Sequence, residues 1–244
     1  RSLVGSEMCI RDSSGARVAR DARRSSTGQD TVDRQPDRPV GRGLGWSVCP
    51  SRHSLTLIGV RMHHPDPYLH GHGDTRYRVS HYELDLTYKV ATNRLDERAQ
   101  LHVEIVEPTP RIDVDLRGLH VGKVLLDGRP TRYRRKANCV TVEVGRREPG
   151  ERFVLDLRVS GKPGPIPGAH GEAGWEELSD GSMVGSQPQG APSWFPCNDD
   201  AADKATYRIT VTADADYHVI ANGTRTECTR VGGNNRWTYE MRRP

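Results

Sequence analysis

The chain has 244 residues, of which 34% are hydrophobic and 28% are charged, and its formal net charge is +4. This length is sufficient for one large or two small domains with a buried core. No apolar run approaches the roughly 18 residues of a transmembrane helix, and no secretory signal is recognisable, so a membrane partner is not expected.

The positive charge lies in the first quarter of the chain. Residues 1–61 contain 11 Arg, no Lys and 6 acidic residues, whereas residues 62–244 contain 25 basic and 26 acidic residues. A protein that binds nucleic acid through its folded part usually has a basic surplus there. No nucleic-acid partner is therefore expected for residues 62–244.

The five cysteines are scattered and odd in number, and no Cys-x-x-Cys pair occurs. This pattern is unlike a disulfide framework and unlike a cysteine-based zinc site. A reducing compartment follows, and we predict a cytoplasmic location. The positions are Cys9, Cys49, Cys139, Cys197 and Cys228.

Residues 1–61 are rich in Arg, Ser, Gly and Asp and have no sustained hydrophobic period. Such a composition buries too little apolar surface to offset chain entropy, so this leader is predicted to be disordered. A basic nucleic-acid-binding arm is one alternative. A leader that is not native coding sequence is another, and it is the alternative that we favour.

Alternation of apolar and polar residues begins near Tyr77 and recurs along the rest of the chain. A period of two is typical of a strand with one solvated face, and the short runs are separated by turn signals such as Asp-Gly and Asn-Gly. With no helical pattern between them, they predict an all-β, antiparallel sandwich or saddle. The runs lie at residues 82–90, 101–105, 112–116, 140–144, 153–159, 207–211 and 237–241.

Between residues 160 and 189 the alternation lapses into a Gly- and Pro-rich stretch. We predict a long loop here, and long loops within compact domains are frequently functional.

The histidines suggest a metal site only weakly. His63, His64, His70, His72 and Asp74 are ligand types on a Gly- and Pro-rich segment, whereas structural sites hold four ligands in tetrahedral geometry. The pattern therefore favours an ordinary Gly- and Pro-rich segment over a metal centre.

His102-Val-Glu104 matches the His-x-Glu of zinc deaminases, but the partner motif Pro-Cys-x-x-Cys is absent. The alternation places both side chains on the solvated face of a strand, so the match is a chance one.

Three acidic residues, Asp199, Asp200 and Asp203, follow a Pro-Cys pair. So close together, they could raise one another's pKa and act as a general acid or base or bind a cation. The favoured interpretation is that they cap a turn before the strand at Tyr207, with Lys204 balancing part of the charge.

Three short motifs carry a resemblance to a known family. They are Ser-Gln-Pro-Gln at 186–189, Pro-Cys-Asn-Asp at 196–199 and Lys-Ala-Thr-Tyr at 204–207. This block resembles the end of the N-terminal β domain in zinc aminopeptidases of the aminopeptidase N and leukotriene hydrolase family. The family usually has Asp-Glu-Pro where this chain has Asp-Asp-Ala at 199–201. The resemblance spans residues 62–244, which gives two predicted regions: a leader, 1–61, and the β domain, 62–244, beginning at Met62.

The resemblance assigns a role to Gln189. In the family this position projects into the neighbouring catalytic cleft and accepts a hydrogen bond from the free α-amine of the bound peptide. A charge-assisted bond of this kind is worth about 1.5–3 kcal/mol. Gln187 is expected to have a supporting, structural role. Without the family context, Gln189 could equally be a loop residue that bonds to nearby backbone.

Family catalysis uses the motifs His-Glu-x-x-His and Gly-x-Met-Glu-Asn, and neither is present here. The resemblance therefore implies a zinc metallo-aminopeptidase truncated before its catalytic domain. Zinc would belong to the full-length parent and none to this chain, which alone is predicted to be inactive and to contain no catalytic residue. Its partners would be peptides with a free N-terminus and the missing catalytic domain. The alternative is a stand-alone β-sandwich module that binds peptide or carbohydrate through residues 161–189.

Overall fold

The computed structural model describes residues 8–12, 72–168, 171–186 and 189–244. All of them belong to one compact unit, which comprises Arg1–Gly15 and His63–Pro244. The predicted boundary between residues 61 and 62 lies outside the described residues and stays a prediction. None of the described helices is long and apolar enough to cross a membrane.

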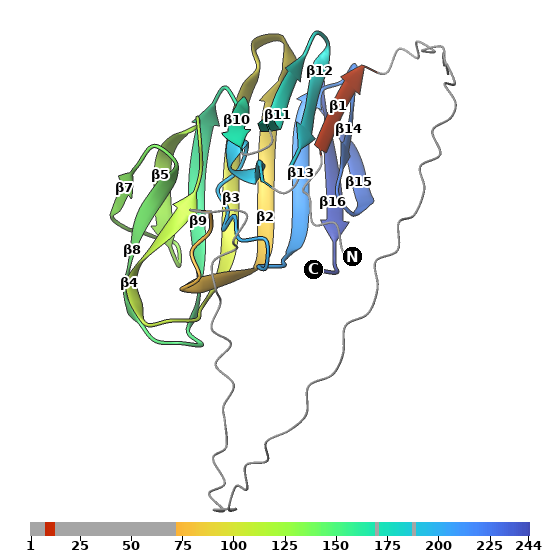
Figure 1. The fold of residues 1–244 in the computed structure, drawn as a ribbon. Coiled ribbons are helices and arrows are strands. Elements are labelled where there is room, and N and C mark those ends of the chain that lie inside the picture. Colours follow the sequence, from red (N-terminus) through yellow and green to blue (C-terminus); the bar gives the residue numbers. More distant parts are fainter. Residues whose placement is uncertain (1–7, 13–71, 169–170, 187–188) are drawn as a thin grey trace, which may run out of the picture. The chain divides into compact units, whose positions relative to one another are not determined.

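The described residues form three β-sheets, so the predicted all-β class is confirmed (Figure 1). The largest sheet has eight strands in the order β15-β16-β13-β2-β3-β9-β5-β6. Every pairing in it is antiparallel except that of β13 with β2, which is parallel. Its strands are β2 (Tyr77–Lys89), β3 (Arg94–Ile105), β5 (His120–Leu126), β6 (Arg129–Pro130), β9 (Arg152–Gly161), β13 (Thr206–Asp214), β15 (Thr224–Val231) and β16 (Asn234–Met241).

The other two sheets are smaller and wholly antiparallel. A five-stranded sheet has the order β10-β11-β12-β1-β14, and a three-stranded sheet has the order β4-β8-β7. Two short 3₁₀ turns, η1 (Val90–Thr92) and η2 (Ala191–Ser193), complete the elements. The strands of these sheets are β1 (Met8–Asp12), β4 (Thr109–Asp115), β7 (Tyr133–Arg135), β8 (Cys139–Arg147), β10 (Pro165–Gly168), β11 (Gly171–Leu178), β12 (Gly181–Gly185) and β14 (Tyr217–Ala221).

The predicted alternation matches the burial of the strands. On β2 and β3 the apolar residues at alternate positions are buried and the polar residues between them are mostly exposed. His102 is exposed and Glu104 half-exposed on the solvated face of β3, as predicted. The exception is Glu97, which occupies a core position of β3.

The turn signals also mark real turns. Asp127 and Gly128 both have positive φ, 48° and 77°, and form the two-residue loop of the β5–β6 hairpin. This is the geometry that favours Asp-Gly. Gly223, with φ 93°, begins the turn into β15, and its missing Cβ would lie 2.3 Å from the Glu240 carbonyl oxygen.

The prediction of one long loop at 160–189 is wrong. Residues in this stretch form β10, β11 and β12, which pair in sequence as an antiparallel meander. Glycine and proline hide the period of two here, yet Trp175 and Val184 are buried in the core. Sheet pairing thus overrides weak local strand propensity.

Five residues of the leader are described. Met8–Asp12 form β1, which lies between β12 and β14 and pairs antiparallel with both. The sequence predicted no element here, because residues 1–61 have no sustained hydrophobic period. The other leader residues lie outside the described part of the chain.

Candidate functional site

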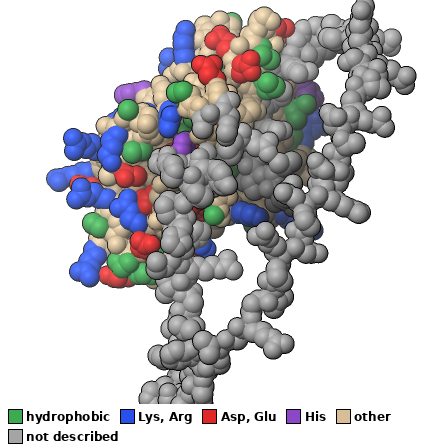
Figure 2. All heavy atoms as spheres, in the orientation of Figure 1, with side chains coloured by type: hydrophobic (Ala, Val, Ile, Leu, Met, Phe, Trp, Pro, Cys, Tyr) green, Lys and Arg blue, Asp and Glu red, His purple; other side chains and the backbone are tan. Residues whose placement is uncertain are grey.

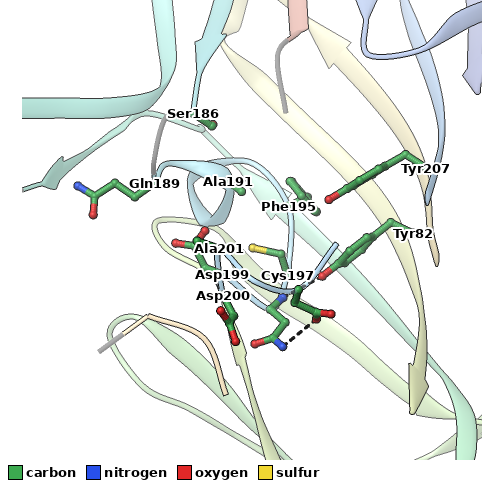
Figure 3. Close-up of a pocket in the computed structure, with 12 residues that line it drawn as sticks. Tyr82, Ser186, Gln189, Ala191, Phe195, Cys197, Asp199, Asp200, Ala201 and Tyr207 are labelled. Carbon is green, nitrogen blue, oxygen red and sulfur yellow. Dashed lines mark hydrogen bonds between the residues drawn. The ribbon is translucent and has the colours of Figure 1, made fainter. Parts of the chain in front are cut away.

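Gln189 lies in the connection between β12 and β13, next to η2. Its side chain is largely buried, with 7% exposed, and it lines a cavity of about 60 Å³. Figure 3 shows the Gln189 amide directed away from Tyr82 and Tyr207, which line the same cavity. Gln187, the predicted supporting residue, lies outside the described residues, and neither predicted role is tested by the structure.

Two glycines fix the backbone beside Gln189. Gly190 has φ 131° and Gly174, on β11, has φ 97°, both outside the range of ordinary L-residues. A Cβ on Gly190 would lie 2.7 Å from the Gly174 nitrogen, and a Cβ on Gly174 would lie 2.7 Å from the Gly190 oxygen. The two backbones therefore touch, which only glycine permits.

Ser193 joins the same two segments by hydrogen bonds. Its hydroxyl donates to the Gly190 carbonyl over 2.6 Å and accepts from the Trp175 backbone N–H over 2.9 Å. The Arg117 backbone N–H donates to the Pro192 carbonyl over 2.7 Å. η2 is thus attached to β11 and to the connection between β4 and β5.

The Pro-Cys-Asn-Asp motif forms the other wall of the cavity. Cys197 is buried and pairs with Asp115 in an isolated β-bridge, with N–O distances of 2.7 and 3.0 Å. Trp194 and Phe195 are also buried, with ring centroids 4.5 Å apart. Burial raises the pKa of the Cys197 thiol, so it is an inert packing group rather than a nucleophile.

Asn198 is the polar centre of this wall. Its Oδ1 accepts from the Asp74 N–H over 2.7 Å, and its Nδ2 donates to the Tyr77 carbonyl over 3.2 Å and to Asp203 over 3.0 Å. Its own backbone N–H donates to the Tyr82 hydroxyl over 3.0 Å. The motif thus ties the segment before β2 to the connection that carries Gln189.

Of the three acidic residues, only Asp200 caps a local turn as the sequence analysis favoured, and Asp199 and Asp203 bind the segment around β2 instead. Asp199 accepts from His72 over 2.7 Å, Asp203 accepts from the Val79 N–H over 2.9 Å, and Asp200 closes a local turn with Ala202. Burial raises the pKa of Asp203 to about 6, against the hydrogen bonds that favour its charged form. All three line the cavity with Gln189, so its wall is acidic.

His72 and Asp115 do not line the cavity but bind Asp199 of its wall. The hydrogen bond to Asp199 raises the pKa of His72, whereas burial raises the pKa of Asp115 to about 6. Asp115 accepts from the backbone N–H groups of Gly73 and Asp199, each over 3.1 Å. These groups hold backbone, and their arrangement is structural.

The described residues do not fit a metal. No group of three or more His, Cys, Asp or Glu side chains among them has the geometry to hold an ion. His63, His64 and His70 lie outside the described residues, while His72 is engaged with Asp199.

Space beside Gly168 accommodates the Gln189 amide. An ideal Cβ on Gly168 would lie 1.4 Å from Gln189 Nε2, so the side chain occupies that position. We expect Gly168→Ala to displace the amide and change stability by less than about 1 kcal/mol, because a flexible side chain can move aside. NMR of the Gln189 side-chain amide would check this: an unchanged resonance would contradict it, and Gly164→Ala, with open space around its Cβ, is the control.

Residues 181–243 match the peptidase M1 N-terminal domain family. No curated protein matches the sequence. The resemblance seen in the sequence is confirmed at the level of this match and of the shared fold.

Solved structures of bacterial M1 enzymes share this fold. A two-domain M1 zinc metallopeptidase bound to L-arginine is 31% identical with a TM-score of 0.67, and the match covers 70% of this chain and 40% of that one. The M1 zinc metallopeptidase of Deinococcus radiodurans bound to a Tyr-Ser-Ala substrate is 32% identical, with a TM-score of 0.66 and the same coverage. Aminopeptidase A of Legionella pneumophila, 17% identical with a TM-score of 0.60 over 71% of this chain and 21% of its own, shares the fold. The chain thus spans about 40% of the length of the first two structures.

Several residues that shape the site were not singled out from the sequence. Gly174, Gly190 and Ser193 fix the connection, and Asn198 organises its wall. Gly190 follows Gln189 directly, and a glycine beside a candidate ligand residue is a usable signal for close backbone approach. Gly174 carried no such signal, because its partner is distant in sequence.

Proposed function

We propose that this domain supplies the substrate-amine site of a zinc metallo-aminopeptidase whose catalytic residues lie outside these 244 residues. In this proposal Gln189 accepts a hydrogen bond from the free α-amine of a peptide, and Gln187 supports the same segment. The enzyme removes N-terminal residues from peptides in the cytoplasm. The domain by itself does not turn over substrate.

The observation that carries the proposal is an acceptor without a hydrogen-bond partner among the described residues, next to a fixed stretch of backbone. No hydrogen bond joins the Gln189 side chain to another residue of the described part. Its backbone is held by the contact of Gly190 with Gly174, so only the side chain has to be ordered on binding. The acidic residues that share its cavity favour a cation such as an ammonium group.

Zinc supplies a Lewis acid and an activated water when it is bound in such enzymes. No group of ligands for zinc lies among the described residues of this chain. We therefore propose that the catalytic domain holds the zinc. The role of this chain is to orient the peptide by its amine. Requiring a free amine restricts cleavage to the first peptide bond.

The test uses the protein encoded by the complete gene and an aminoacyl anilide substrate. Gln189→Ala should lower kcat/KM by roughly 10- to 100-fold, as expected for one hydrogen bond to a charged donor. Gln189→Glu should retain most of the activity, because a carboxylate accepts the same bond.

Gln100→Ala, a half-buried glutamine on β3, is the matched control and should leave kcat/KM unchanged. Equal activity of Gln189→Ala and the wild type would remove the proposed role of Gln189. Hydrolysis by the purified 244-residue chain that a chelator abolishes would contradict the assignment of catalysis to another domain.

One observation favours the second candidate, a stand-alone binding module. Exposed large hydrophobic side chains in the described residues are confined to Tyr133, Ile220 and Val231, on three different strands. A domain cut from a large interface would expose a broader apolar patch. The module would bind peptide or carbohydrate through residues 161–189, and binding of N-acetylated and free peptides with equal affinity would favour it over the amine site.

A further inference from the structure

Positive charge is concentrated in one part of the domain that the amine site does not use. Residues 117–147 contain nine Arg or Lys and two Asp or Glu, a net charge of +7. The other residues of 62–244 contain 16 basic and 24 acidic residues, a net charge of −8. The near-neutral total of the domain therefore conceals a strongly basic region. Figure 2 shows Lys and Arg side chains gathered where β5, β7 and β8 lie in Figure 1.

The centre of this region is an edge strand. β7 pairs on one side only, with β8, and is the last strand of the three-stranded sheet. The preceding segment, β6, is likewise the last strand of the eight-stranded sheet. One continuous segment, 129–136, therefore forms the edge of two sheets.

Side chains alternate along this edge between the protein body and the solvent. Thr131, Tyr133 and Arg135 each donate a side-chain hydrogen bond to a backbone carbonyl of the protein body, to Glu143 over 2.6 Å, to Val121 over 3.1 Å and to Leu116 over 2.9 Å, and Tyr133 stays 39% exposed.

The residues between them, Arg132, Arg134 and Lys136, are exposed. Alternate residues of a strand are about 6.6–6.8 Å apart. We call these three residues the basic edge.

In the described part of the chain, acidic residues lie beside the basic edge only on the side of β8 and β4. Arg132 lies opposite Glu143 on β8, and Lys136 Nζ lies 3.4 Å from an Asp113 carboxylate oxygen on β4. Among the described residues, Arg132 and Arg134 have no side-chain hydrogen bond or ion pair. On the outer side of β7, no described strand supplies an acidic partner.

We propose that the basic edge binds an acidic peptide segment in extended conformation. Such a strand would continue the three-stranded sheet, and carboxylates at its alternate positions would face Arg132, Arg134 and Lys136. Main-chain pairing at an open edge supplies affinity, and alternate side chains supply selectivity. Opposite charges directly across a strand pair are favourable.

Other occupants fit the edge less well. Single-stranded nucleic acid stacks on several aromatic side chains, whereas β7 offers one, Tyr133, whose hydroxyl is bound to the Val121 carbonyl. Cations on a short edge strand also oppose self-association. Preventing self-association needs few charges, whereas residues 117–147 have seven more basic than acidic residues.

The test measures binding of a fluorescent peptide of four Glu-Thr repeats to the 244-residue chain, with Gln-Thr repeats for comparison. The triple variant Arg132→Ala, Arg134→Ala, Lys136→Ala should bind the acidic peptide at least roughly tenfold more weakly. Lys89→Ala, Lys204→Ala, Arg208→Ala removes the same charge from exposed sites elsewhere and should bind within about threefold of the wild type.

Two further measurements separate the outcomes. N-methylation of alternate peptide nitrogens should abolish binding if the peptide pairs as a strand, and lysine in place of both arginines should retain it. Equal binding by wild type and triple variant, or of Glu-Thr and Gln-Thr peptides, would overturn the proposal. Tighter binding of single-stranded RNA or phosphatidylserine vesicles, lost in the triple variant, would assign the basic edge to that partner and likewise overturn it.

Discussion

Gly190→Ala is expected to destabilise the domain by about 3–5 kcal/mol, a large fraction of the stability of a typical domain. Two costs add at this position. Gly190 has φ 131°, which an alanine adopts only with strain, and its Cβ would lie 2.7–2.8 Å from the Gly174 backbone. Backbone atoms cannot move aside as a side chain can. Urea-induced unfolding of the purified chain measures the change.

Gly185→Ala is the matched control for this substitution. Gly185 ends β12, five residues before Gly190, and nothing lies within 4 Å of its Cβ position. We expect a change of less than about 0.5 kcal/mol. Equal stability of the Gly190→Ala variant and the wild type would show that the two segments do not touch, and the fixed position of Gln189 would then have no basis.

Glu97→Leu is expected to stabilise the domain by about 1–3 kcal/mol. Glu97 is 5% exposed, and neither carboxylate oxygen has a hydrogen-bond partner among the described residues. It lies on β3 opposite Leu86 and Val159, both buried. A leucine of similar volume satisfies this apolar site and leaves no polar atom unpaired.

The stability gained by Glu97→Leu should depend on pH. Burial raises the pKa of Glu97 well above its ordinary value of 4.5, so the folded state favours the protonated carboxyl. The destabilising contribution of Glu97 is then smallest below about pH 4.5, and it grows as pH rises toward the folded pKa, by up to about 1.4 kcal/mol per pH unit. The advantage of Glu97→Leu should therefore be small at pH 4 and larger at pH 7.

Glu104→Leu on the same strand provides the comparison. Glu104 is half-exposed and its carboxylate lies 2.7 Å from Arg152, so its loss should not stabilise the domain at any pH. A Glu97→Leu variant that is less stable than the wild type at pH 7 would contradict an unpaired buried carboxyl. Asp115 and Asp203, with pKa values near 6, also make the free energy of unfolding fall as pH rises. Both variants keep these residues, so their effect cancels when the two variants are compared.

The strands with regular alternation could be predicted from the sequence. Leu84, Leu86, Leu101 and Val103 reach the core because a strand turns every second side chain to one face. The meander of β10 to β12 could not be predicted, because its glycines and prolines remove that period and its pairing is set by neighbouring strands. Glu97 was missed for the same reason, since a charged residue at a core position breaks the pattern.

The sequence by itself determined the all-β class, the turns at Asp127-Gly128 and Asn222-Gly223, and the family motif that includes Gln189. These depend on local periodicity and on residue types at fixed spacing. Only the tertiary structure decided that Gly190 touches Gly174 and that Gln189 lies against Gly168. It also decided that the basic edge lies along an open edge of a sheet. Such contacts join residues distant along the chain, and sheet pairing rather than local sequence brings them together.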